Sequence, residues 1–177
     1  MSIPTFVDLQ GFVFNKNFIV KEAAILRKGF IVSHYFFTCP VPWGVLIKSE
    51  RRQVTWATFK HHGLQWEDGN IPYSRAQDLI TAAIDVGVSD EEESSLIYVK
   101  GHEKRKWLAD ILDDAANDFI IETLDEHYED VPTLKALDTT NSLRCNKHLK
   151  NCALQNVFKL YNWWLKNRND SPHPFIE

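Results

Sequence analysis

The chain opens with three consecutive runs of apolar, β-prone residues separated by short polar breaks. The runs cover residues 6–14, 18–26 and 30–39, and the breaks are residues 15–17 and 27–29. Breaks of this length join antiparallel strands in hairpins. The sequence therefore predicts a three-stranded antiparallel meander.

After Pro40, Pro42 and Gly44 the spacing of the apolar residues changes, and it becomes typical of helices that alternate with short strands. Ser49 and Ser74 are the expected caps of the first two helices, and Gly63 is the expected end of the first. The acidic residues 90–93 are expected to form a solvated turn. Helices are predicted over residues 49–61, 74–86, 102–113, 131–137 and 151–167, and strands over residues 96–99 and 119–121.

Three antiparallel strands followed by strand–helix alternation predict an α/β fold with a mixed sheet flanked by helices. The ribonuclease H-like fold has this order, and it is the architecture that we expect among several α/β alternatives. The length of 177 residues fits one domain. We place this domain at residues 1–167 and expect a loose tail at residues 168–177.

Composition and charge narrow the class of protein. Hydrophobic residues make up 44% of the chain and aromatic residues 12%, which excludes a disordered chain. The formal net charge of -4 argues against non-specific coating of duplex phosphate. No apolar run approaches the roughly 20 residues of a membrane span, and no secretory signal is recognised. Three cysteines cannot all form disulfides within the chain, which indicates a reducing compartment. We therefore expect an intracellular protein, cytoplasmic or nuclear. Because no membrane span is found, we expect no membrane partner.

A degenerate nuclease motif lies on the first predicted strand. Asp8 and Gln10 are two residues apart, so their side chains share one face of that strand. The segment resembles the opening motif of the DEDDh 3′–5′ exonucleases, in which an Asp-x-Glu pair holds two catalytic metal ions. Here Gln10 replaces the glutamate.

Two later segments resemble the other exonuclease motifs, again without their catalytic groups. Residues 99–103 end a strand with Gly-His but lack the aspartate that should follow. Residues 151–156 resemble His-x-Ala-Leu-x-Asp, with Asn151 and Asn156 in place of the histidine and the aspartate. Two-metal hydrolysis needs converging negative charge, so we predict no magnesium-dependent exonuclease and no catalytic role for these positions.

A cysteine–histidine cluster precedes the last predicted helix. Cys145, His148 and Cys152 provide three ligands of the types that tetrahedral zinc prefers, and a structural zinc site needs a fourth. On spacing alone the alternative stays open that the cysteines are ordinary core thiols and that His148 lies on the surface.

The chain resembles the Maelstrom domain of the germline transposon-silencing pathway, a degenerate DEDDh nuclease with a Glu-Cys-His-Cys zinc set. The glutamate of that family lies on the second strand, in a segment to which residues 18–25 are similar, and Glu22 matches it. The resemblance implies a structural Zn²⁺ held by Glu22, Cys145, His148 and Cys152. The alternative for Glu22 is a carboxylate on an edge strand that faces solvent.

A basic and aromatic cluster, Lys104, Arg105, Lys106 and Trp107, lies at the start of a predicted helix. If the fold is ribonuclease H-like, this cluster borders the former active site, where cations favour phosphate and aromatic rings favour unpaired bases. The competing interpretation is a solvated helix turn with a core tryptophan. His61 and His62 are adjacent on a predicted helix, so we do not expect them to bind one ion.

Two functions of different classes follow. The first is a zinc-stabilised, catalytically degenerate domain that binds single-stranded RNA; the resemblance implies a link to RNA or transposon silencing and a metal-independent endoribonuclease activity. The second is a non-enzymatic protein-interaction module, either a silencing adaptor or an antagonist encoded by a virus or transposon. The cationic cluster favours the first function and the acidic net charge favours the second.

Overall fold

The three apolar runs at the start of the chain form the predicted antiparallel meander. The computed structural model describes residues 3–85, 95–148 and 150–168. The meander consists of β1 (Thr5–Phe14), β2 (Asn17–Arg27) and β3 (Ile31–Phe36). β3 ends three residues before the predicted end, because Phe37 instead forms an isolated parallel bridge with Ile71.

Two parallel strands extend the sheet on the other side of β1. They are β4 (Leu96–Val99) and β5 (Ile120–Thr123). β4 pairs with β1 and β5 pairs with β4, both in parallel, so the strand order is β3-β2-β1-β4-β5. The predicted class, an α/β fold with a mixed sheet flanked by helices, is confirmed.

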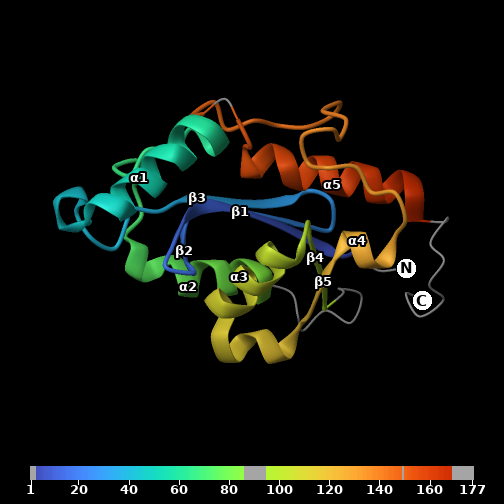
Figure 1. Ribbon diagram of the computed structural model, residues 1–177. Coiled ribbons are helices and arrows are strands. Elements are labelled where there is room, and N and C mark those ends of the chain that lie inside the picture. The colour runs from blue at the N-terminus through green and yellow to red at the C-terminus, as the bar shows by residue number, and fades with distance from the viewer. Residues whose placement is uncertain (1–2, 86–94, 149, 169–177) are drawn as a thin grey trace.

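Helices cover both faces of this sheet (Figure 1). α1 and α5 lie on one face, and α2 and α3 lie on the other. None of the helices in the described part of the chain is both long enough and apolar enough to span a membrane. The α-helices are α1 (Lys48–Ala57), α2 (Ala76–Asp85), α3 (His102–Leu112), α4 (Leu124–His127) and α5 (Ala153–Asn167). The other helical turns are η1 (Trp43–Val45), η2 (Thr58–His62), η3 (Tyr73–Arg75) and η4 (Asp113–Asp118).

Several helix boundaries differ from the prediction. α1 begins at Lys48, where the Ile47 backbone N–H donates to Glu50 Oε1 at 3.0 Å, so Ser49 is not its cap. α2 begins after the turn η3, two residues beyond Ser74. α1 continues through the π-helical turn η2 and ends at Gly63 in the left-handed conformation, as predicted.

The predicted helix at residues 131–137 is wrong. The segment forms a turn in which the backbone N–H groups of Ala136 and Leu137 donate to the carbonyl oxygen of Thr133. The predicted acidic turn at residues 90–93 lies outside the described residues, as does the predicted tail beyond Arg168.

The side chains of β1 alternate between two cores, and this alternation positions the site. Val7 and Leu9 pack in the core beneath α2 and α3, whereas Phe6 packs with α5. Asp8 and Gln10 share the Phe6 face and are buried there, at 0% and 2% exposure. Two polar side chains are therefore enclosed between the sheet and α5, and each needs a polar partner.

Candidate functional site

The register of the meander places the two sequence motifs next to each other. Gln10 on β1 pairs directly with Glu22 on β2, and the register then shifts by one residue at Gly11. A side chain at Gly11 would not fit, since its Cβ would lie 2.0 Å from the Ile19 carbonyl oxygen. The motif that contains Asp8 and Gln10 and the candidate metal ligand Glu22 are thus neighbours on one face of the sheet.

The structure brings together the four predicted metal ligands. Glu22 comes from β2, Cys145 and His148 from the loop before α5, and Cys152 from the N-cap of α5. Their ligand atoms all lie within 4.8 Å of one another. His148 Nε2 is 3.0 Å from Glu22 Oε1, and Cys152 Sγ is 3.9 Å from Glu22 Oε2. Ligand atoms around a tetrahedral zinc ion are about 3.3–3.8 Å apart, so this cluster can hold a metal ion.

The imidazole of His148 is oriented for metal coordination. Its Nδ1 donates to the carbonyl oxygens of His62 and Lys150, both at 2.7 Å. These bonds fix the proton on Nδ1 and direct Nε2 into the cluster. Nε2 is buried and makes no well-aligned hydrogen bond within the described part of the chain. A buried nitrogen beside two thiols and a carboxylate is an environment that suits a metal cation.

The carboxylate of Glu22 is fully buried and held in place by two donors. His34 Nε2 lies 2.7 Å from Oε2, and the Ala153 backbone N–H at the start of α5 donates to Oε1 at 3.0 Å. Burial raises the pKa of Glu22, but the contacts with His148 and His34 outweigh it and lower that pKa to about 2. The carboxylate is therefore ionised, as a metal ligand must be.

Sequence reasoning missed His34. It pairs with Ala24 on β2, and this register brings it beside Glu22, which lies two residues before Ala24. The predicted meander already contained this information, because a polar residue in an otherwise apolar strand needs a partner on the neighbouring strand.

The two thiols accept backbone hydrogen bonds and have shifted pKa values. The Cys145 N–H donates to Cys152 Sγ, and the Lys147 N–H donates to Cys145 Sγ, both at 3.4 Å. Burial raises the pKa of Cys145; burial also raises that of Cys152, but contact with His148 outweighs it and lowers the pKa. Burial lowers the pKa of His148, whereas Cys152 and Glu22 raise it to about 11. The cluster thus stabilises a positive charge at its centre.

Asp8, at the start of the motif that resembles a DEDDh exonuclease, takes part in an internal ion pair. Lys104 Nζ on α3 lies 2.5 Å from Asp8 Oδ1. Gln10 Nε2 and Asn156 Nδ2 donate to Asp8 Oδ2 at 3.0 and 2.8 Å. Both carboxylate oxygens therefore have partners, and a lysine ammonium is bound to the aspartate that would hold a metal ion in a DEDDh nuclease.

Asn151 is separate from this ion pair. Its backbone has a positive φ of 44°, and its side-chain Nδ2 donates to the His61 carbonyl oxygen at 2.5 Å. Asn151 therefore joins the loop before α5 to η2. The positive φ also explains why α5 begins at Ala153, two residues later than predicted.

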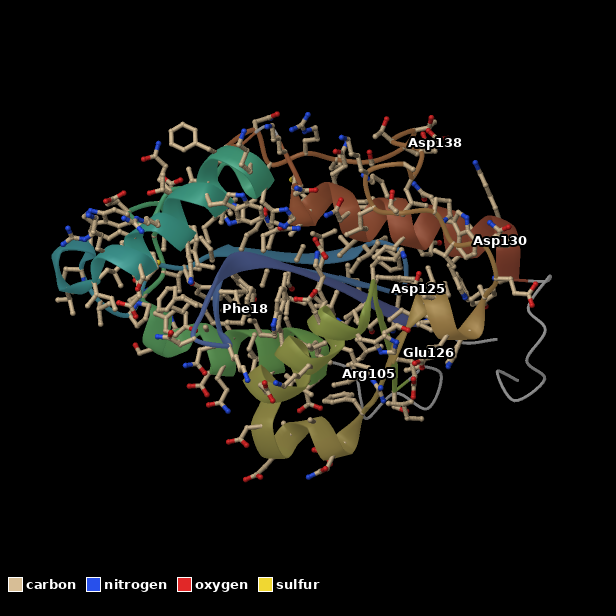
Figure 2. All side chains as sticks on the ribbon, in the orientation of Figure 1. Phe18, Arg105, Asp125, Glu126, Asp130 and Asp138 are labelled. Atoms are coloured by element: carbon tan, nitrogen blue, oxygen red, sulfur yellow. The ribbon has the colours of Figure 1, made fainter. Side chains whose placement is uncertain are left out.

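The four residues of the predicted RNA-binding cluster do not share one surface. Lys104 is bound to Asp8, and Trp107 stacks on Phe18 with ring centroids 4.0 Å apart and planes 2° apart. Arg105 Nε donates to the Ile121 carbonyl oxygen at 2.8 Å, and Arg105 lies towards the β5–α4 end of the molecule, away from Phe18 (Figure 2). Lys106 is exposed and lines a separate hollow with Arg105.

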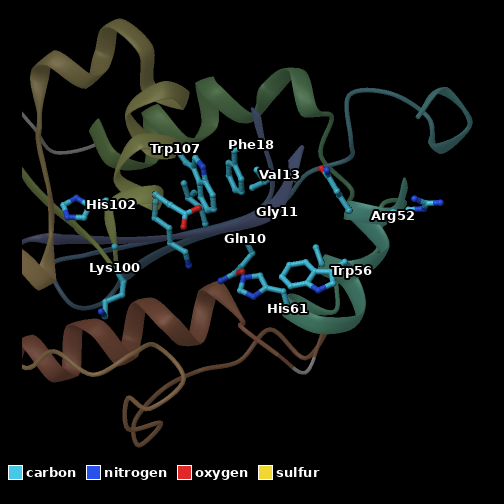
Figure 3. Close-up of a pocket in the computed structure, with 16 residues that line it drawn as sticks. Gln10, Gly11, Val13, Phe18, Arg52, Trp56, His61, Lys100, His102 and Trp107 are labelled. Carbon is cyan, nitrogen blue, oxygen red and sulfur yellow. The ribbon is translucent and has the colours of Figure 1, made fainter. Parts of the chain in front are cut away.

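A cleft of about 1020 Å³ lies beside the ion pair (Figure 3). Its lining comes from three parts of the chain: β1 with Phe18, α1 with η2, and the beginning of α3. Gln10 and Gly11 lie in the middle of the lining. The sixteen lining residues are Leu9, Gln10, Gly11, Val13, Phe18, Arg52, Gln53, Trp56, Ala57, His61, Lys100, Gly101, His102, Glu103, Lys104 and Trp107.

His61 and His62 have separate environments. His62 is fully buried; its Nε2 donates to the Gly11 carbonyl oxygen at 2.8 Å, and its Nδ1 accepts the Leu64 N–H at 2.9 Å. Burial lowers the pKa of His62 to about 4. His61 is exposed and lines the cleft. The pair therefore does not form a second metal site.

Comparison of the chain with protein-family models, with curated proteins and with solved structures gives no match. The features of the described residues that bear on function are the candidate metal cluster, the ion pair and the cleft.

Proposed function

We propose that this chain is a metal-stabilised, ribonuclease H-like domain that no longer has a nuclease centre and that binds single-stranded RNA. The observation that carries the proposal is the ion pair between Lys104 and Asp8, because Asp8 matches the aspartate that would bind metal ions in a DEDDh nuclease. The strand order β3-β2-β1-β4-β5, antiparallel and then parallel, supports the ribonuclease H-like assignment. Kinship with the Maelstrom domain, a role in silencing and a metal-independent ribonuclease activity stay predictions.

The metal that fits the cluster best is Zn²⁺ in a structural role. Two thiolates, one imidazole and one carboxylate form a donor set that suits tetrahedral zinc. Four protein ligands leave no open position for water, so the ion would support the fold and would not activate a hydroxide. It would join β2 to the start of α5, two segments that are far apart in the sequence.

We expect no magnesium-dependent exonuclease activity from the purified protein. Asp8 already accepts from three donors, and two of them, Gln10 and Asn156, stand at positions where the exonuclease motif has carboxylates. The measurement is incubation of end-labelled single-stranded RNA and DNA with Mg²⁺ or Mn²⁺. Progressive trimming from the 3′ end that needs the metal ion and disappears in Asp8→Asn would contradict the prediction.

Weak, salt-sensitive binding of single-stranded RNA is expected, with a dissociation constant of about 10⁻⁴ to 10⁻⁶ M. The net charge of -4 opposes long-range attraction of a polyanion, so local contacts must supply the affinity. A titration of labelled oligonucleotide across a salt series measures this. No binding at low salt would overturn the RNA function.

Lys104 has to be left intact in tests of the cationic cluster, because its substitution would strip the buried Asp8 of its partner. The double variant Arg105→Gln, Lys106→Gln tests the remaining cations. Lys166→Gln, which changes an exposed lysine on α5, is the matched control. Weaker binding in the double variant alone would assign RNA contacts to α3.

The alternative, a protein-interaction module, is favoured by one observation. Four large apolar side chains in the segment from η1 to η2 are exposed, namely Val45, Ile47, Trp56 and Phe59, at 63%, 62%, 61% and 72%. Exposed apolar groups of this size favour contact with another protein. The titration above discriminates the two functions, since an interaction module does not need to bind RNA.

A further inference from the structure

The cleft beside the ion pair has an aromatic wall that the fold does not require. Trp56, in the last turn of α1, lines the cleft and keeps 61% of its surface exposed. Exposure of a large indole forgoes the free energy that its burial would provide. The folded core gains little from this side chain, so its place in the cleft needs another reason.

A second aromatic wall faces the same space. Phe18 and Trp107 stack in parallel, with planes 2° apart, and both line the cleft. Figure 3 shows this pair and Trp56 on different sides of Gln10 and Gly11. The stack holds each ring against the other, so this wall is rigid. Two aromatic walls around one cleft suit a flat ring as ligand.

The polar side chains on the α1 side of the cleft are suited to bind the phosphate and the base edge of a nucleotide. Arg52 precedes Trp56 by four residues, so both lie on one face of α1. Arg52 is exposed and makes no ion pair within the described part of the chain. Gln53 and His61, which also line the cleft, are exposed and offer hydrogen-bonding groups suited to a base edge.

The other cations of the cleft are already neutralised. Lys104 pairs with Asp8, and Lys100 pairs with Asp125. Arg52 lies at the opposite end of the cleft from Lys100 (Figure 3). The acidic lining residue, Glu103, belongs to α3 and not to α1. A phosphate is therefore expected at the α1 end.

We infer that this cleft binds one unpaired nucleotide, with its base against Trp56 and its phosphate at Arg52. The inference rests on the proposed function, because it names the site through which single-stranded RNA is bound. It assigns the principal contacts to α1 in place of the cationic cluster on α3. A base in a duplex is stacked and paired, so a duplex cannot present this ligand.

The test is fluorescence anisotropy of a labelled single-stranded RNA with the full chain and two pairs of variants. Trp56→Ala is paired with Phe59→Ala, an aromatic residue that is 72% exposed and does not line the cleft. Arg52→Gln is paired with Lys60→Gln, an exposed cation outside the cleft lining. All four positions are exposed, and unchanged circular dichroism and melting temperature verify that each variant is folded.

We expect Trp56→Ala to weaken binding by about 5- to 150-fold, which is the range for loss of one stacked base. Arg52→Gln should reduce the slope of log affinity against log salt by about one. Phe59→Ala and Lys60→Gln should behave as wild type. A duplex of the same sequence should bind more weakly than the single strand, and single-stranded DNA should bind if the base and the phosphate suffice.

A nucleoside monophosphate, followed by quenching of tryptophan fluorescence, separates the outcomes. If RNA binds but Trp56→Ala has no effect and the α3 double variant weakens it, the cleft inference is overturned and the proposed function stands. If no oligonucleotide binds but the monophosphate quenches wild type and not Trp56→Ala, the RNA function fails and the nucleotide site is supported. Absence of both signals overturns both.

Discussion

Replacement of Cys145 by serine is expected to abolish stoichiometric zinc binding and to lower the melting temperature by about 10 °C or more. Binding of structural zinc is coupled directly to folding, with apparent free energies of about 10–16 kcal/mol in small zinc domains. In a chain of this size each kcal/mol of stability shifts the melting temperature by about 2–4 °C. The effect is large because the cluster joins β2 to the start of α5, and both pack in the core.

The chain contains a matched control for this experiment. Cys39 lies outside the cluster, with its Sγ 3.7 Å from the Nζ of the buried Lys21. Cys39→Ser keeps a polar group at that position and should keep wild-type zinc content. Zinc is measured by elemental analysis of each purified variant, and stability by thermal unfolding with and without a chelator. A wild-type sample without zinc whose unfolding a chelator does not change would refute the metal assignment.

Replacement of Lys104 by methionine is expected to destabilise the domain by about 3–5 kcal/mol. This is the usual cost when one partner of a buried ion pair is removed and the other charge stays behind. Asp8 is fully buried and would keep the hydrogen bonds from Gln10 and Asn156 but lose its cation. Denaturant unfolding measures the free-energy difference.

Asp8→Asn should cost less than Lys104→Met. The side chain of Lys104 retains 12% exposure and lines the cleft, so its free ammonium can reach water through a flexible stem. The double variant Asp8→Asn, Lys104→Met should be more stable than Lys104→Met alone, because no unpaired charge remains in it. If the two single variants lost equal free energies of unfolding and the double variant lost their sum, Asp8 and Lys104 would not act as an ion pair.

The sequence alone could predict those elements that depend on local pattern. The meander, the position of β4 and the amphipathic α5 follow from period-two alternation, short turns and an apolar stripe, all of which act over a few residues. The predicted positions of the helix termini were less accurate, because a terminus depends on the backbone conformation of a single residue, such as the positive φ of Asn151. The helix predicted at residues 131–137 is too short for its apolar residues to indicate a period.

The candidate metal cluster was predictable because its three loop ligands lie within eight residues, and the resemblance supplied Glu22. The hydrogen bond that orients His148 was not predictable. The carbonyl oxygen of His62 lies on η2, whose neighbours are decided only when the sheet and α1 pack together.

The sequence by itself determined that the residues resembling the exonuclease motifs lack most of the charge of a two-metal centre, and which metal-ligand types are present. Gln10, Asn151 and Asn156 cannot provide the charge that two metal ions require, whatever the fold. Only the tertiary structure decided the roles of the cations on α3. Residues 104–106 are adjacent in sequence, but successive helix positions point about 100° apart. Packing of α3 against the sheet therefore turns Lys104 inward to the buried Asp8, while Lys106 remains in solvent.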